Sequence, residues 1–208
     1  MALVARSGLA LKRIIDIVVS GAALLVGLPF LFLLACAVAI ESGFPVLYRQ
    51  TRVGRGAREF QLLKFRSMRP DGVGPSITVS GDKRVTRVGR YLRASKLDEF
   101  PQLWNVLIGE MSLVGPRPEV PEYVELFRLR YEHILSVRPG ITDLASIRFR
   151  GEERILAASQ DPLQEYVKAI LPQKLTLAEE YIRRRSVWLD LWILLKTVSI
   201  VFWPDPVS

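Results

Sequence analysis

The chain has 208 residues, one cysteine, one histidine and a formal net charge of +8. This length is typical of one folded domain with a membrane element, and the positive charge favours anionic partners such as nucleic acid, acidic lipid or phosphorylated substrates. Because Cys36 is the only cysteine, the chain cannot form an intrachain disulfide, which agrees with a domain that faces the cytosol. The lone His133 excludes a zinc site of clustered Cys and His residues.

The most informative segment is an uncharged, mostly apolar run from Ile17 to Ile40. As a straight helix it would be roughly 36 Å long, enough to cross a bilayer. Pro29 lies near its middle and removes a helical hydrogen bond, so the helix is expected to break there. Cations flank both ends, although Lys and Arg normally mark the cytoplasmic end of a crossing helix. We therefore predict a re-entrant membrane helix pair over 9–40, within a membrane element of residues 1–42. The flanking cations are Arg6, Lys12 and Arg13 before the run and Arg49, Arg52, Arg55 and Arg58 after it.

Three other interpretations of this run stay open. It could be a single-pass anchor with a proline kink, because membrane helices tolerate proline. It could be a signal peptide cleaved near Ala37–Ala39 or at Cys36, although it is longer than a usual signal and contains a proline. It could be the buried core helix of a soluble protein, which its length disfavours. Asp16, at the mouth of the run, is expected to pair with Lys12 and Arg13 or to begin the helix in solvent.

Residues 43–208 are predicted to form one cytosolic α+β domain, mostly helical with a small β-hairpin. Val46–Gln50 and Phe60–Phe65 have strand-like composition, and a turn at Gly54-Arg55-Gly56 joins them into the hairpin. Glycines and prolines predict loops over 70–82 and Ser112–Pro118. Helices are predicted over 86–95, 98–108, 121–136, 161–170 and 173–184, and Leu144–Phe149 is expected to be extended.

The C-terminal stretch Val187–Trp203 is apolar and contains three tryptophans. Asp190 and Lys196 lie inside it, which disfavours a second membrane-spanning helix. Tryptophans on an apolar helix are typical of the membrane interface, so we predict an interfacial amphipathic helix. The alternative is a core helix of the soluble domain.

Adjacent carboxylates at Asp98 and Glu99 precede Pro101, a residue that suits the first turn of a helix. One interpretation is simple helix N-terminal charge, stabilised by the helix dipole. A second interpretation is phosphate chemistry, because a diphosphate substrate needs cationic clamps and usually a divalent metal. A carboxylate could then hold the metal or attack phosphorus itself. The surrounding cations are Arg93, Arg117 between two prolines, and Lys64 and Arg66 on one face of a strand.

Five motifs follow one another along nearly the whole chain: Lys12-Arg13-Ile14-Ile15-Asp16, Lys64-Phe65-Arg66-Ser67-Met68, Leu97–Val106, Met111–Pro118 and Arg138-Pro139-Gly140-Ile141-Thr142. Together they resemble the motifs of the bacterial sugar transferases, the monotopic phosphoglycosyl transferases. Five ordered motifs are far more specific than any one of them. The length of the chain resembles the minimal catalytic form of that family.

The resemblance implies an activity and a set of roles. Members of the family transfer a sugar-1-phosphate from a nucleoside diphosphate sugar, usually UDP-linked, to a polyprenol phosphate, usually undecaprenyl phosphate, and release UMP. By resemblance, Asp98 is the nucleophile that forms a covalent phosphosugar intermediate, Glu99 is its essential partner, and Mg²⁺ lies at Asp98. Lys64, Arg93 and Arg117 are the cations expected at the diphosphate. Glu99 is expected either to help deprotonate the incoming phosphate or to position the metal.

The resemblance also implies a location and partners. Family members insert a re-entrant helix broken near a proline, as at Pro29, and keep the catalytic domain on the cytosolic face of the bacterial inner (cytoplasmic) membrane. Lys12, Arg13 and Asp16 are accordingly expected to serve membrane insertion. The expected partners are a UDP-sugar, a polyprenol phosphate and membrane lipid, with a homodimer left open. No nucleic acid is expected, because the sequence has no clear stacking platform or recognition helix.

One stretch departs from the family pattern. After Arg138–Thr142, many members continue with Gly and a Gln-Val-Asn-Gly-Arg-like run, whereas this chain has Asp143–Arg150. Arg150 is expected to take the position of that arginine and to bind phosphate. The departure leaves the sugar open. Two other functions also stay open: a non-enzymatic basic module that binds anionic lipid or nucleic acid at the membrane surface, and a hydrolase of the same donor.

Overall fold

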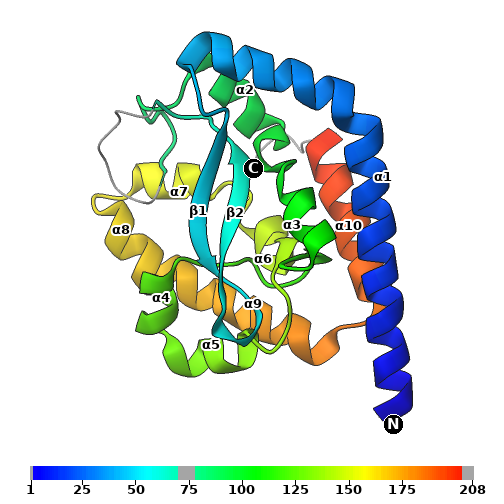
Figure 1. Cartoon of the computed structure of the whole chain (residues 1–208). Coiled ribbons are helices and arrows are strands. Elements are labelled where there is room, and N and C mark those ends of the chain that lie inside the picture. The colour runs from blue at the N-terminus through cyan, green and yellow to red at the C-terminus, as the bar shows by residue number, and fades with distance from the viewer. Residues whose placement is uncertain (1, 70–77, 203–208) are drawn as a thin grey trace.

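The computed structural model describes residues 2–69 and 78–202 (Figure 1). Part of the loop predicted over 70–82, and Trp203, therefore lie outside the described residues. The first element is α1, Ala2–Ser42, a single helix that bends sharply partway along. Pro29 lies inside α1, where a proline removes a hydrogen bond and kinks the helix. The predicted pair of helices is thus one continuous, bent helix.

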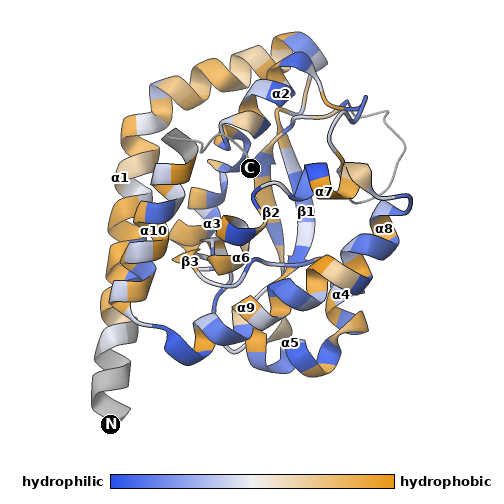
Figure 2. Cartoon of the chain, turned by 180° about the vertical axis from the view of Figure 1, so that it is seen from behind, coloured by the Kyte–Doolittle hydropathy of each residue, from blue (hydrophilic) through white to orange (hydrophobic). Residues whose placement is uncertain are grey.

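The apolar part of α1 lies on the surface of the molecule. Residues Ala10–Ser42 are long and apolar enough to cross a membrane. An 18-residue window within this segment has a mean hydropathy of 2.7, and only 6% of the window is buried. Figure 2 shows hydrophobic residues along both arms of the bent helix. The interpretation of this run as a buried core helix is therefore wrong.

The predicted hairpin is confirmed. Strands β1, Leu47–Val53, and β2, Glu59–Phe65, pair antiparallel, and the short helix η1, Arg55–Ala57, lies in the turn between them. Alternate side chains of β2 point to opposite faces, so Phe60 and Leu62 enter the core. Lys64 follows on the same face as Phe60 and Leu62, whereas Phe65 on the other face is buried against Val38 and Leu92.

The helix predicted over 98–108 is two separate elements. A 3-10 turn, η2, spans Leu97–Glu99, and α3 spans Gln102–Ile108. Pro101 lies between them and has no N–H with which to continue one hydrogen-bond ladder. The two adjacent carboxylates therefore belong to a tight turn rather than to the first turn of a long helix.

Residues 112–114 were predicted as loop, and this is wrong. They form β3, Ser112–Val114, which pairs parallel with β4, Gly140–Thr142. The two strands meet at an unusually close approach of the backbone, because a Cβ added at Gly140 would lie 2.1 Å from the backbone nitrogen of Gly115. Glycine is required at this crossing for steric reasons.

The remaining elements are helices, and several predicted boundaries change. The helix predicted over 121–136 breaks at Phe127. Leu144–Phe149 is helical rather than extended, because the Asp143 carboxylate accepts a hydrogen bond from the N–H of Ser146 and caps the first turn. The helices predicted over 161–170 and 173–184 are continuous with each other. The helix α7, Glu152–Ala158, was not predicted. The bounds are α2 Arg87–Ala94, α4 Pro121–Leu126, α5 Arg128–Ile134, α6 Leu144–Arg148, α7 Glu152–Ala158, α8 Pro162–Glu165, the π-helix η3 Tyr166–Ile170, α9 Leu171–Arg184 and α10 Val187–Phe202.

Helix α10 has both an exposed apolar face and a core face. Trp188 is 80% exposed and Leu195 is also exposed, whereas Ile193 is fully buried in the main hydrophobic core. This core fills the space between β2, α3, β3, α9 and α10. The core interpretation is therefore confirmed for one face of α10, and the exposed apolar face leaves the interfacial helix as a prediction.

The first arm of α1 is bonded to the domain by its cations. Lys12 Nζ lies 2.6 Å from Asp190 Oδ2 on α10 and donates to the carbonyl of Val114, 2.9 Å away. The Arg13 guanidinium donates to two carbonyls in the last turn of α3, at 2.7 and 2.9 Å. Carbonyls in the last turn of a helix lack the usual partner four residues later, and the Val106 carbonyl also accepts the Gly109 N–H at 3.1 Å, so Arg13 and Gly109 together complete the end of α3.

Asp16 continues this contact into β3. It is 3% exposed, and its two oxygens accept hydrogen bonds from the Ser112 hydroxyl at 2.8 Å and the Leu113 N–H at 3.0 Å. The expectation of a solvated helix start is therefore wrong. The expected pairing with Lys12 and Arg13 is also wrong, because those two side chains bond to α3, β3 and α10 instead.

The second arm of α1 is bonded to the same domain at its end. Arg66, immediately after β2, donates to the carbonyl of Ser42 at 2.6 Å. The Glu41 carboxylate accepts from the N–H groups of Arg87 and Val88, at 2.7 and 2.8 Å, where α2 begins. One folded domain thus holds both ends of the apolar helix.

The Asp16 contact can be tested by substitution. In Asp16→Ala, the buried Ser112 hydroxyl and Leu113 N–H lose their acceptor, so we expect the free energy of unfolding to fall by about 1–3 kcal/mol. Thermal unfolding of the protein in lipid nanodiscs measures this loss as a lower Tm. Glu132→Ala, at an exposed position, is the matched control and should change stability by no more than about 0.5 kcal/mol. Equal Tm values for the two variants would contradict the expected role of Asp16.

Candidate active site

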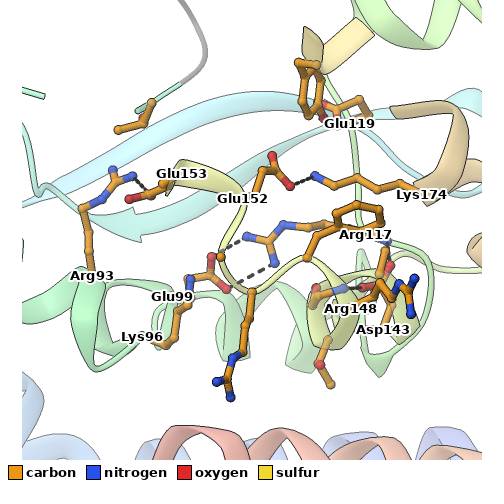
Figure 3. A pocket seen from close by; sticks show the side chains of 18 of the residues that line it. Arg93, Lys96, Glu99, Arg117, Glu119, Asp143, Arg148, Glu152, Glu153 and Lys174 are labelled. Atoms are coloured by element: carbon orange, nitrogen blue, oxygen red, sulfur yellow. Dashed lines mark hydrogen bonds and ion pairs between the residues drawn. The ribbon is translucent and has the colours of Figure 1, made fainter. Parts of the chain in front are cut away.

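A cleft of about 1720 Å³ is lined by residues of β2, α2, η2, α6, α7 and α9. Its wall is highly charged, and Figure 3 shows several of the charged side chains pointing toward one another across it. Asp98 and Glu99 lie in the wall, so the structure brings the adjacent carboxylates to a concave surface. The basic residues that line the cleft include Lys64, Arg90, Arg93, Lys96, Arg117, Arg148, Arg150 and Lys174.

Asp98 is a buried carboxylate with an unused oxygen. Asp98 is 7% exposed, and its Oδ1 atom has no hydrogen-bond partner among the described residues. Burial raises the pKa of Asp98, Lys64 opposes that shift, and the neighbouring charge of Glu99 adds to it. A buried, unpaired carboxylate oxygen is costly, which suits an atom that binds a cation or attacks an electrophile.

The backbone before Asp98 has an uncommon conformation. Lys96 has φ 58° and ψ 14°, in the left-handed region that non-glycine residues seldom adopt. This residue lies between α2 and η2, so it reverses the chain before the turn that carries both carboxylates. Such local strain is frequent at functional sites.

Glu99 is bonded to two cations. Its Oε1 lies 3.1 Å from Lys64 Nζ and also contacts Arg117 Nη2, while Oε2 accepts from Arg117 Nη1 at 3.4 Å. Burial alone would raise the pKa of Glu99, but the charges of Arg117 and Lys64 outweigh it and hold that pKa well below its ordinary range. Glu99 is therefore ionised at physiological pH and is poorly suited to act as a general base.

The pKa values of Lys64 and Arg117 are shifted in opposite directions. Burial lowers the pKa of Lys64, and the charge of Glu99 partly offsets that effect. The charge of Glu99 raises the pKa of Arg117. Both side chains sit beside Asp98, where a bound diphosphate would meet them together with that carboxylate.

Arg117 is held in a well-bonded loop. Its N–H donates to Asp143 Oδ2 at 3.1 Å, and its guanidinium donates to the carbonyl of Ile141 at 3.2 Å. The preceding carbonyl, of Pro116, accepts from the N–H of Gly140 at 3.0 Å. The loop after β3 is thus fixed on β4 and on the start of α6, which sets the direction of the guanidinium.

Two further ion pairs lie in the wall of the cleft. Arg93 on α2 is ion-paired with Glu153, and Lys174 on α9 is ion-paired with Glu152 (Figure 3). Arg150 also lines the cleft. Of the residues predicted to bind phosphate, Lys64, Arg93, Arg117 and Arg150 therefore share one cleft, whereas Arg66 does not line it and instead bonds the end of α1.

Some residues of the site were not found from the sequence. Asp143 had a readable local signal, because an Asp immediately before a helical stretch is a typical N-cap. Lys174 had none, since a lysine in an amphipathic helix is usually a solvated charge. Its partner Glu152 is remote in sequence, and only the fold brings them together.

The described residues contain no group of three or more His, Cys, Asp or Glu side chains that could hold a metal ion. A divalent ion such as Mg²⁺ is nevertheless often bound by one or two carboxylates together with substrate phosphates. The unused Oδ1 of Asp98 fits the first part of that ligand set. The site is thus suited to a metal that arrives with, and is completed by, a phosphorylated substrate.

Relatives of known activity resemble this chain over most of its length. The UDP-glucose:undecaprenyl-phosphate glucose-1-phosphate transferase of Caulobacter vibrioides is 42% identical over 202 residues, which cover 93% of this chain and 70% of that protein. A Klebsiella pneumoniae protein of the same name is 40% identical over 193 residues, covering 90% of this chain and 39% of that protein.

A third relative carries a different sugar in its name. The UDP-N-acetylgalactosamine-undecaprenyl-phosphate N-acetylgalactosaminephosphotransferase of Aeromonas hydrophila is 35% identical over 200 residues, covering 92% of this chain and 43% of that protein. The chain thus spans roughly two fifths of the two longer relatives. Residues 7–204 match the family model described as bacterial sugar transferase, and the chain belongs to that family.

Proposed function

We propose that this protein transfers a sugar-1-phosphate from a UDP-sugar to undecaprenyl phosphate and releases UMP. The names of the relatives support this donor and this acceptor. The single observation that carries the chemistry is the buried Asp98, whose Oδ1 has no partner among the described residues and which lies in a cleft beside Lys64 and Arg117. A binding module of the membrane surface would have no need for an unpaired carboxylate in such a position.

The proposed reaction has two displacements at the same phosphorus atom. In the first, an oxygen of ionised Asp98 attacks the β-phosphorus of the donor. The bond to the bridging oxygen breaks, and UMP leaves with that electron pair. A phosphosugar is then joined to Asp98 as an acyl phosphate. In the second, an oxygen of the acceptor phosphate attacks that phosphorus, and the Asp98 carboxylate leaves.

The cations of the site would neutralise the diphosphate as charge moves onto the leaving group. Lys64 and Arg117 are already held in the cleft by Glu99, the neighbour of Asp98, so little reorganisation would be needed. Glu99, being ionised, would hold these two cations in position rather than remove a proton. Mg²⁺, when bound at Asp98 with the donor phosphates, would add further charge neutralisation.

We also propose that α1 is re-entrant and that the catalytic domain lies on the cytosolic face of the bacterial cytoplasmic membrane. The two ends of the apolar helix are bonded to one domain, through Asp16 at one end and Arg66 at the other. A helix that crossed the bilayer would put those ends on opposite faces and break one set of bonds. The exposed tryptophans of α10 would then lie in the lipid headgroup region.

The covalent step predicts a mass change on Asp98. Wild-type protein incubated with Mg²⁺ and a panel of UDP-sugars, without acceptor, should gain the mass of one phosphosugar and release an equal amount of UMP. In Asp98→Asn the adduct should be absent, and lipid-linked product should fall by at least about a thousandfold. Glu132→Gln, at an exposed position, is the control and should behave as wild type. Product that accumulates while no adduct ever forms would refute the covalent step.

The charge of Glu99 predicts a shift in pH dependence. Adduct formation needs ionised Asp98, whose pKa is raised, so the rate should fall as the pH drops through that raised value. Glu99 contributes to raising the pKa of Asp98, so Glu99→Gln should move the acidic limb of the rate profile to lower pH. Its maximal rate should fall, because Lys64 and Arg117 lose their partner. Rapid-quench mass spectrometry across pH measures both effects, and an acidic limb that stays in place or moves upward would contradict this role.

The topology predicts labelling from one side only. In a Cys36→Ala background, Ala10→Cys and Phe44→Cys place single thiols at exposed positions near the two ends of α1. A membrane-impermeant maleimide should label both in inverted vesicles and neither in intact spheroplasts. Permeabilised membranes, in which both thiols react, are the control. Labelling of the two positions from opposite faces would show that α1 crosses the bilayer.

A further inference from the structure

The cleft around Asp98 has two unlike ends. On one side lie the ion pairs Arg93–Glu153 and Lys174–Glu152, contributed by α2, α7 and α9. The wall also includes the apolar side chains of Phe100, Leu103, Ile147 and Ile200, from the loop after η2 and from α3, α6 and α10. We call the part of the cleft that these four residues line its apolar end. In Figure 3 the labelled ion pairs lie on one side of the Glu99–Arg117 contact, and the ribbons of α1 and α10 run past the opposite side.

The apolar end is built against the two helices that carry the exposed hydrophobic surface. A Cβ added at Gly27 of α1 would lie 3.2 Å from the ring of Phe100, so the helix and this wall residue are in close contact. On α10, the Thr197 hydroxyl lies 2.7 Å from that of Thr142, which fixes α10 over β4. Trp188 and Leu195, on α10, are exposed. The apolar end of the cleft therefore adjoins lipid-facing helices.

We propose that the prenyl chain of the acceptor leaves the Asp98 site through this apolar end. It lies over Phe100 and Ile147 and passes α10 at Thr197 and Ile200 before it enters the bilayer. This inference rests on the proposed transfer to a prenyl phosphate and specifies the position of that acceptor. Its ligand class is a long-chain isoprenyl phosphate, whose headgroup meets Lys64 and Arg117 while its chain contacts apolar side chains.

The chemistry of the acceptor selects between the two ends. Its phosphate has to reach Asp98 while most of its chain remains in hydrocarbon. A path over the Arg93–Glu153 and Lys174–Glu152 pairs would bury charged groups against an alkyl chain, at a large cost in desolvation. A path past Ile147 and Ile200 instead removes apolar surface from water, which is favourable. The polar end is left for the hydrophilic nucleotide of the donor.

The two half-reactions test this path separately. Full-length protein in nanodiscs is first given the UDP-sugar that forms the adduct, and the adduct is then chased with undecaprenyl phosphate. Ile200→Trp narrows the apolar end, so the UMP burst should keep its wild-type rate while the KM for the acceptor rises by about tenfold. Leu195→Trp, on the exposed face of the same helix, is the matched control and should leave both steps unchanged. The defect should shrink with a short-chain prenyl phosphate, since less of that chain reaches α10.

A second measurement needs no substitution. A prenyl phosphate with a diazirine close to its phosphate end should, on irradiation with wild-type protein, label peptides from α6 and α10. Labels confined to α7 and α9 would overturn the proposed path, as would an Ile200→Trp variant that slows neither half-reaction or slows both equally. In each of those cases the wild-type adduct would still form and the proposed function would stand. A wild-type protein that releases no UMP and forms no adduct would instead refute the proposed function and this inference with it.

Discussion

Glu99 balances the positive charges of Lys64 and Arg117 in the cleft. Lys64 and Arg117 are cations that line the same cleft, and burial, with a smaller effect of the Arg117 charge, lowers the pKa of Lys64. The Glu99 carboxylate, bonded to both, is what keeps the two together in protonated form without a substrate. In the proposed reaction, a bound diphosphate would supply additional negative charge to the same cations. They could then share or exchange partners without either being left as an uncompensated buried charge, which would be strongly destabilising.

The position of Arg117 in turn depends on a close crossing of two short strands. Gly115 and Gly140 allow the backbones of β3 and β4 to approach more closely than any side chain would permit. The carbonyl of Val114, immediately before this crossing, accepts hydrogen bonds from Lys12 at 2.9 Å and Tyr181 at 3.3 Å. The loop that directs the Arg117 guanidinium into the cleft is therefore bonded directly to α1. In the proposed function, phosphate binding and membrane insertion would depend on the same few residues.

Sequence patterns were informative where the cause of a structure is local. The turn between the strands of the hairpin and the apolar run with Pro29 both depend on neighbouring residues, and both are present in the fold. The family motifs also contain Asp98, Glu99, Lys64 and Arg117, and all four line the cleft. Local reasoning was wrong at Leu144–Phe149 because the cap from Asp143 was not weighed, although a capping Asp favours helix over strand.

The other errors arise from partners that are distant in the sequence. Nothing near Ser112 indicates a strand, because its hydrogen bonds are made with Pro139 and Asp16. Arg66 and Lys64 share a strand face, yet Arg66 is used by the carbonyl of Ser42 and only Lys64 reaches the cleft. A pattern that places two cations on one face cannot distinguish a substrate ligand from a helix cap. That distinction depends on which element packs above each residue.

The bend of α1 follows from two physical causes of different kinds. Pro29 removes one hydrogen bond and so makes bending inexpensive at that position, but a proline alone does not prescribe the direction of the second arm. The direction is prescribed by the contacts of Asp16 with β3 and of Glu41 with the start of α2. Straightening the helix would break one of these sets. Loss of the Asp16 set would leave the buried Ser112 hydroxyl and Leu113 N–H without an acceptor, at roughly 1–3 kcal/mol for each group. The folded domain therefore determines the path of its own membrane helix, and the proline makes that path accessible.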